Sequence, residues 1–414
     1  MDRVTPALGE FLADETTKAE DKKDLLNFLA DRPKCAPVTS LLPVEDLEVR
    51  LQAIDDIRKK LTPERDGDEP QLNYLQFATL LLLPLNFLTS FKEMFHGTIQ
   101  KEFSTELIEA TLFFMMRGRI PGTASAASSV AGSVRGSITG SVEGSVEGSV
   151  EGPATPATSA KNDKESQAGA ARVNPKKTYR DASERKKCLV RDGNACLLMQ
   201  TAMPEVCHVL PFSIGATDAA MDFFSKTCGH LIYGLLSGTK DYNTLTDMSK
   251  NRGWSDKAWN MLCLNHQLHA WWAEGYFALK YLGTIPKNKE ASIVQLQFHW
   301  MPRNGLDRQQ KCTIPEALEA MQRTVSDDNG FVKATRASSG RSLTTGQVFE
   351  IPVHPEEAPK MKLMIDLQWA TIRLAALSGA AGYIDELDKE YHDPWDEDLA
   401  LCKRLIKEWT ESTP

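Results

Sequence analysis

Apolar residues recur at helical spacing near the start of the chain. The segment 44–61, VEDLEVRLQAIDDIRKKL, repeats an apolar residue every three or four positions and carries charges on its other faces. These apolar positions are Leu47, Leu51, Ile54 and Ile57. The pattern predicts an amphipathic helix, and a second helical stretch is expected over residues 71–95. We therefore predict that residues 1–121 form a helical region that packs against the rest of the chain or contacts a partner.

The most apolar stretch, LLLLPLNFL at residues 80–88, is interrupted by Pro84 and Asn86. A membrane-spanning helix needs about 20 consecutive apolar residues. We expect a buried helix that is kinked at the proline, with contact to a membrane surface as the alternative.

Strand patterns begin in the middle of the chain. SIVQLQFHW, residues 292–300, alternates apolar with polar positions, which is typical of a half-buried strand. CLVRDGNACLLM, residues 188–199, predicts two strands joined by an Asp-Gly turn. VCHVLPF predicts a further strand that ends before Pro211. The segment 259–282 is expected to begin extended, to become helical near His266 and to return to a strand after Gly275.

Between these strands lies a long insertion, residues 217–255, with a helical start and a polar end. The pattern of the C-terminal part predicts a helix over residues 314–325, a strand over 346–353, and a long amphipathic helix that stops near Gly379. A final helix is expected over residues 396–412. We expect these elements to form a scaffold around the central strands.

A Gly/Ser tract separates the two halves of the chain. The tetrapeptide Gly-Ser-Val/Ile-x occurs five times, starting at Gly132, Gly136, Gly140, Gly144 and Gly148. Such a tract buries too little apolar surface to offset its chain entropy. We predict a disordered linker at 122–175 between the helical region 1–121 and a central domain at 176–305, with 306–414 packing on that domain.

The overall charge of the chain excludes few classes of function. The formal net charge is −8 and the pI about 5.6, which is not typical of a general nucleic-acid binder. Residues 161–187, however, hold nine Lys/Arg and four Asp/Glu, a balance that suits either phosphate contacts or a solvated helix. The eight cysteines form no CxxC pair, which is typical of reduced thiols. With no secretory leader at the start, we expect an intracellular protein of the nucleus or cytoplasm.

Three polar residues in the central domain form a candidate site. His208 ends a predicted strand, Asn260 precedes another, and His269 follows Asn260 by nine residues on the predicted helix. A histidine on a strand and another on a helix can place a general base beside a divalent metal. A single histidine in an apolar strand would otherwise be a core residue.

These segments resemble the HNH endonucleases, and in particular HNH-domain proteins common in filamentous fungi. The resemblance rests on RDGNAC, EVCHVLPF, NMLCLNHQLHAWW and the C-terminal TGQVFEIPV, in this order, and covers about residues 178–385. It implies an α+β fold with a ββα-metal core, here carrying helical additions and preceded by the helical region and the linker.

The resemblance also implies roles for individual residues. His208 matches the general base that deprotonates the attacking water, and Asn260 matches the middle residue that positions the site. His269 matches the helix histidine that binds the metal. The implied cofactor is a divalent ion, foremost Mg²⁺, with Zn²⁺, Mn²⁺ or Ni²⁺ as alternatives, and the implied partner is nucleic acid, foremost DNA, rather than a membrane.

The chain departs from the family pattern at two metal positions. Cys207 stands where many members have an Asp or His before the base, and it is a candidate metal ligand because a thiolate can bind Zn²⁺, although it is a poor ligand for Mg²⁺. Ala273 stands where many members have a second helix ligand. Glu274 would need a local distortion to replace it. His266, three residues before His269, could share its face and substitute as a ligand.

The sequence therefore predicts a metal-dependent HNH endonuclease that hydrolyses DNA phosphodiester bonds. The incomplete metal shell leaves a rival open, a catalytically degenerate module of the same fold that binds DNA or a protein partner. A third alternative is an interaction scaffold in which the linker joins two unrelated domains.

Overall fold

The computed structural model describes residues 4–61, 69–96, 180–236, 239–303, 305–326 and 333–382, and the single residues 99, 103 and 110. All of them belong to one compact unit, formed by residues 1–121 and 177–414. The predicted linker, 122–175, and the final predicted helix, 396–412, lie outside the described residues.

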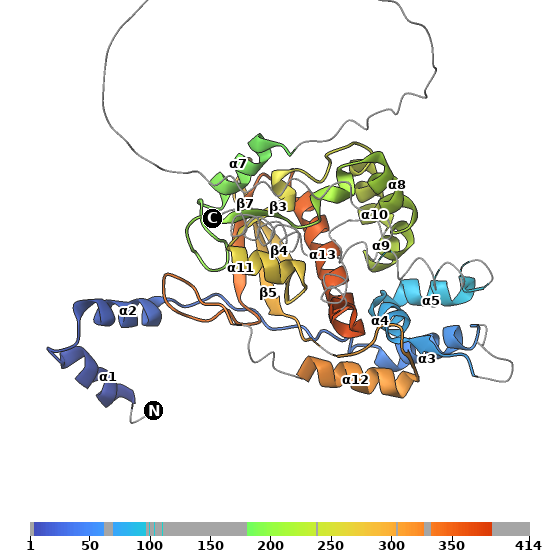
Figure 1. Ribbon diagram of the computed structural model, residues 1–414, viewed down its shortest axis with the longest axis horizontal. Coiled ribbons are helices and arrows are strands. Elements are labelled where there is room, and N and C mark those ends of the chain that lie inside the picture. The colour runs from blue at the N-terminus through green and yellow to red at the C-terminus, as the bar shows by residue number, and fades with distance from the viewer. Residues whose placement is uncertain are drawn as a thin grey trace, which may run out of the picture. The chain divides into compact units, whose positions relative to one another are not determined.

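An antiparallel sheet of three strands and a long helix form the centre of this unit (Figure 1). In the sheet, β5 (Ser292–Trp300) pairs with β4 (Phe277–Pro286) on one side and with β7 (Val348–Val353) on the other. The helix α13 (Ala358–Ser378) packs mainly on β4. The predicted strands at 292–300 and 346–353, and the strand expected after Gly275, are thus confirmed.

The strand β5 is more deeply buried than its alternation predicts. Val294 and Phe298 are fully buried, as expected, but Gln297 and His299 on the other face are 0% and 1% exposed. That face is covered by α13, where the ring of Trp369 lies 4.8 Å from that of His299. The prediction of a half-buried strand was therefore wrong here, because a polar residue can be buried when neighbouring elements supply hydrogen bonds.

The long helix ends where the sequence predicts. Gly379 adopts a left-handed φ of +82° after α13, a conformation that glycine reaches without steric cost. A Cβ at this position would overlap the carbonyl of Leu306. The glycine therefore both stops the helix and lets the 306 segment approach it closely.

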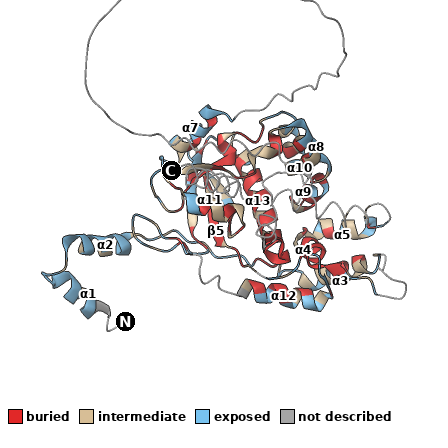
Figure 2. Cartoon of the chain, in the orientation of Figure 1, coloured by how far each residue is buried: buried red, intermediate tan, exposed pale blue. Residues whose placement is uncertain are grey.

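The helical elements of the N-terminal part are mostly those expected. The apolar face of 44–61 forms α3 and buries Ile54 and Ile57. The stretch 71–95 is divided into two helices at Pro84, and the first of them packs against α13. The bounds are α1 (Val4–Ala13), α2 (Ala19–Ala30), α3 (Leu47–Arg58), β1 (Leu72–Asn73), α4 (Tyr74–Leu82) and α5 (Leu85–Met94). Figure 2 shows that α4 is largely buried and that α1 and α2 are largely exposed.

A second, smaller sheet carries the candidate residues. The strand β2 (Glu205–His208) pairs antiparallel with β3 (Met261–Leu264), so that His208 lies opposite Met261. The helix α11 (His266–Ala273) follows β3 directly and contacts β2, and α7 (Ala182–Arg191) contacts both strands. The predicted order of strand, connection, strand and helix is present.

The segment 188–199 was predicted wrongly as two strands. Residues up to Arg191 instead continue α7, which begins at an Asp181 cap and buries Glu184 and Cys188 one turn apart. The Asp-Gly turn that follows leads only to an isolated bridge between Ala195 and Ala202. Val190, whose apolar character favoured a strand, is 64% exposed, so the 3.6-residue period that starts upstream determines the structure.

The insertion between β2 and β3 is helical beyond its predicted start. Thr217 caps the first of its helices by accepting the N–H of Ala220. The elements here are η1 (Phe212–Gly215), α8 (Asp218–Lys226), α9 (Gly229–Leu235), α10 (Thr239–Met248) and η2 (Ala258–Asn260). The remaining elements are β6 (Lys311–Cys312), α12 (Ile314–Ser326) and η3 (Ala380–Gly382).

Candidate active site

The side chain of His208 is held by a buried carboxylate. Its Nε2 lies 2.8 Å from Oδ1 of Asp256, and the two side chains are 10% and 5% exposed. The other oxygen of Asp256 accepts the backbone N–H of Asp181 at 2.5 Å. Burial raises the pKa of Asp256, but the hydrogen bonds from His208 and Asp181 outweigh it, so that this pKa is lower than usual. An ionised carboxylate only accepts hydrogen bonds, so Nε2 carries the proton and Nδ1 is the ring nitrogen that can take another.

A cation lies beside this His208–Asp256 pair. The ring of Phe212 is 5.8 Å from that of His208, and the guanidinium of Arg180 lies over Phe212 at 5.6 Å. The charge of Arg180 also contributes to the low pKa of Asp256. Arg180 is exposed and belongs to the positively charged segment 161–187, of which residues 161–179 lie outside the described residues.

Asn260 connects the two sides of the insertion. It is fully buried. Its Nδ2 donates to the carbonyls of Leu210 and Ser255 at 2.9 and 2.7 Å, and its Oδ1 accepts the N–H of Leu210 at 2.9 Å. The side chain therefore fixes the turn after His208 to the segment that supplies Asp256.

The helix histidines share a different carboxylate. The Nδ1 atoms of His266 and His269 lie 2.8 and 2.7 Å from the two oxygens of Glu205. Burial raises the pKa of Glu205, but both histidines lower it, and the net pKa is below the usual value. Asn265 begins this helix by accepting the N–H groups of Gln267 and Leu268. Two imidazoles and one carboxylate are thus gathered at a partly exposed position.

Cys207 lies apart from both groups of polar residues. Successive residues of a strand point to opposite faces, so Cys207 shares a face with Glu205 and not with His208. The thiol is 1% exposed and donates to the carbonyl of Glu205 at 3.5 Å. Burial raises its pKa, which keeps it protonated and makes it a poor metal ligand.

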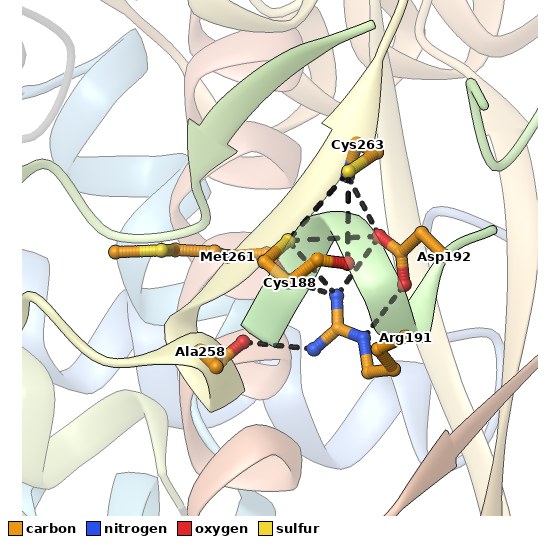
Figure 3. Close-up of polar contacts among 6 residues, drawn as sticks. All are labelled: Cys188, Arg191, Asp192, Ala258, Met261 and Cys263. Carbon is orange, nitrogen blue, oxygen red and sulfur yellow. Dashed lines mark hydrogen bonds and ion pairs between the residues drawn. The ribbon is translucent and has the colours of Figure 1, made fainter. Parts of the chain in front are cut away.

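A further group on α7 and β3 was missed by the sequence reasoning. One ligand atom from each of Cys188, Asp192 and Cys263 lies within 4.8 Å of the others, an arrangement that could hold a metal ion. The guanidinium of Arg191 already points into this group (Figure 3). Its Nη2 lies 3.0 Å from Oδ2 of Asp192 and 3.4 Å from the sulfur of Cys188.

Arg191 also fixes the surrounding backbone. It donates to the carbonyls of Ala258 and Met261 at 2.8 and 2.7 Å. The hydrogen bond with Cys263, followed by burial, raises the pKa of the Cys188 thiol. A protonated thiol and a guanidinium in the place of a cation do not suit a resident metal. We interpret this group as the link that holds α7 to the small sheet.

Sequence reasoning identified only some of these candidate residues. His208, Asn260, His266 and His269 were predicted, whereas Asp256 and Glu205 were missed. Asp256 lies in a polar stretch without periodicity, 48 residues from its partner in sequence. For Glu205 a signal was present, because it directly precedes the predicted strand that carries His208.

Comparison with known proteins finds a family match for part of the chain. Residues 188–280 match the family model described as HNH endonuclease, so the resemblance noted in the sequence is confirmed for this segment. Domains of this family generally bind a divalent metal and act on nucleic acid. Searches of curated proteins and of solved structures gave no significant match. Within the described residues, no helix is long and apolar enough to cross a membrane.

Proposed function

We propose that this protein is a metal-dependent endonuclease that hydrolyses phosphodiester bonds of DNA, with His208 as the general base. The observation that carries this proposal is the contact of His208 with the buried, ionised Asp256, 2.8 Å from its Nε2. In this proposal, β2, β3 and α11 form the ββα-metal core of the family.

The His208–Asp256 pair favours proton transfer at neutral pH. Nδ1 of His208 takes the proton of the attacking water, and the imidazolium that forms is stabilised by the carboxylate on its other nitrogen. Asn260 positions both groups through the turn that it fixes. Arg180 contacts the phosphate, since an exposed guanidinium can bind its oxygens in a bidentate manner.

The metal would be held by His269 and Glu205, with His266 as a further ligand. Imidazole and carboxylate are common donors to divalent ions, and two imidazoles favour Zn²⁺ or Ni²⁺ over Mg²⁺ or Mn²⁺. Such an ion supplies stabilisation of negative charge on the phosphate. Cys207 is not part of this ligand set, because its thiol is buried and burial raises its pKa, which keeps it protonated.

One arrangement favours the second candidate, a degenerate module that binds DNA or a protein without cleaving it. The hydrogen bonds described for His208 and His269 go to different carboxylates, Asp256 and Glu205. Glu205, which holds His269, lies on the face of β2 opposite His208, because the two residues are three positions apart on the strand. Ala273 also offers no ligand on the helix.

Nicking of supercoiled plasmid distinguishes the two candidates. The wild type is assayed with Mg²⁺, Mn²⁺, Ni²⁺ or Zn²⁺ beside the variants His208→Ala and Asp256→Asn, and His354→Ala, outside the matched segment, is the control. We expect His208→Ala to reduce the nicking rate by about 10²- to 10⁴-fold, the usual contribution of a general base, and Asp256→Asn to reduce it in the same direction because the carboxylate that holds His208 is lost. Equal nicking by the wild type and His208→Ala would reject the catalytic proposal. Binding of DNA without nicking by the wild type would support the degenerate module.

A further inference from the structure

A cavity of about 600 Å³ lies on α13, bounded also by α9, α10 and the end of α4. None of its lining residues belongs to the candidate active site. Its volume is in the range of small-molecule sites. One wall is apolar and includes Leu235, Leu236 and Trp369, whereas the other carries charged residues.

The two acidic residues of the cavity share one lysine. Nζ of Lys362 lies 3.3 Å from Oδ2 of Asp241 and 2.5 Å from Oδ2 of Asp366. Asp366 follows Lys362 by one turn on α13. Burial is the main reason that the pKa of Asp366 is raised, which further limits its negative charge. These three residues thus form a closed network with at most one excess negative charge.

Arg373 lies about two turns beyond Asp366 on α13 and, unlike Lys362, forms no ion pair with a carboxylate of the described residues. Its Nε donates to the carbonyl of Leu41 at 2.5 Å. Among the described residues, no carboxylate forms an ion pair with it, and its two Nη groups have no hydrogen-bond acceptor. Lys240, which also lines the cavity, is exposed and likewise lacks an ion pair in the described part of the chain.

The surroundings of Arg373 add positive charge. Burial and the charge of Arg50 lower the pKa of Arg373 to about 10. Burial and the charges of Lys280 and Arg373 lower the pKa of His299 to about 4. Arg373 is half-buried, and a partly desolvated cation costs free energy unless it is paired, so an anion in the cavity would relieve this repulsion.

We propose that this cavity binds a small phosphorylated molecule, whose phosphate contacts Arg373 and Lys240 and whose organic part packs on Leu235, Leu236 and Trp369. A guanidinium with two free Nη groups matches the bidentate geometry of phosphate oxygens. A phosphate dianion also neutralises the two unpaired cations that line the cavity, whereas a carboxylate neutralises one. The site is separate from the proposed nuclease centre and does not depend on it.

Calorimetric titration of the full chain tests this proposal. The probes are orthophosphate, pyrophosphate and adenosine monophosphate, with acetate at the same ionic strength as the control anion. We expect binding of at least one phosphate probe and none of acetate. No binding of any phosphate probe, or equal binding of acetate, would overturn the proposal.

Three variants locate the binding. Ala370→Glu adds a carboxylate to the cavity wall, and Lys240→Glu reverses an exposed charge without removing a described contact, so both should fold. Arg373→Gln removes the guanidinium itself. Each should weaken the phosphate probe at least about tenfold, because hydrogen bonds to charged groups contribute about that much. Lys226→Glu, an exposed residue of α8, should leave the affinity unchanged.

Two further outcomes bear on the source of the phosphate. If Ala370→Glu weakens binding of a short DNA duplex as strongly as it weakens the phosphate probe, the cavity serves nucleic acid and the small-molecule proposal fails. If phosphate binding survives in His208→Ala and is lost in Ala370→Glu, the cavity is confirmed independently of nuclease activity. Unchanged phosphate affinity in both Ala370→Glu and Lys240→Glu would place the binding elsewhere and refute the assignment.

Discussion

Acidification should destabilise the fold through a single buried histidine. His299 is 1% exposed, and its Nε2 lies 2.8 Å from the side-chain oxygen of Gln297. Burial and the charges of Lys280 and Arg373 lower its pKa from 6.5 to about 4. Between these two values the unfolded chain takes up a proton that the native protein does not bind.

The sign and size of the effect follow from this difference. The stabilisation is fully present above pH 6.5 and is lost as the pH falls toward 4, because the unfolded state binds more protons throughout that window. One pKa unit corresponds to about 1.4 kcal/mol, so the complete loss is about 3 kcal/mol. About 2 kcal/mol of it is already lost at pH 5.

Urea unfolding at a series of pH values measures this loss. Other groups titrate in the same range, so the useful quantity is the difference in unfolding free energy between the wild type and His299→Gln. We expect this difference to change by about 2 kcal/mol between pH 7.5 and pH 5, in the direction that brings the wild type closer to the variant. His354→Gln, at an exposed position, is the control. Parallel pH profiles of the wild type and His299→Gln would refute the argument.

Two further substitutions test the packing around the site. Asp192→Asn should lower the free energy of unfolding by about 3–5 kcal/mol, because it leaves the guanidinium of Arg191 buried without its counter-ion. Urea unfolding measures this loss. Asp222→Asn, in an exposed ion pair, is the control and should change the free energy of unfolding by less than about 1 kcal/mol. Gly379→Ala should cost about 2–5 kcal/mol, since it combines a left-handed φ with overlap of the Leu306 carbonyl. Gly283→Ala, where a Cβ meets nothing within 4 Å, is its thermal-unfolding control, and equal melting temperatures of the two variants would contradict this account.

Periodicity predicted the elements whose burial is decided locally. The alternation in 292–300 and the run that stops at Gly379 correctly predicted a strand and a helix, which are present as β5 and α13, but not that the polar face of β5 is buried as well. The same reasoning failed at residues 188–191, where a short apolar run suits a strand, but the helix that begins at Asp181 continues through it.

The candidate site was predictable only in its histidines and Asn260. Their spacing is a sequence pattern, whereas the carboxylates that hold them are chosen by the fold. Asp256 reaches His208 because Asn260 closes the insertion, and Glu205 reaches His269 because α11 folds back over β2. Neither event leaves a periodic signal. The burial of Cys207 likewise depends on which face of β2 is covered by the core.

The hydrogen bonds of Asn260 have a consequence for how the protein can change. They join Leu210 and Ser255 at the base of a long excursion of the chain, so the geometry around His208 is set by the two ends of the insertion and not by its length. Insertions in the turns between helices α8 to α10 therefore cost little entropy, whereas the helices themselves bury Phe224, Ile232 and Leu245 in the core and must keep these contacts. The same separation would allow α9 and α10, which border the cavity, to acquire a ligand without altering the strands that carry the histidines.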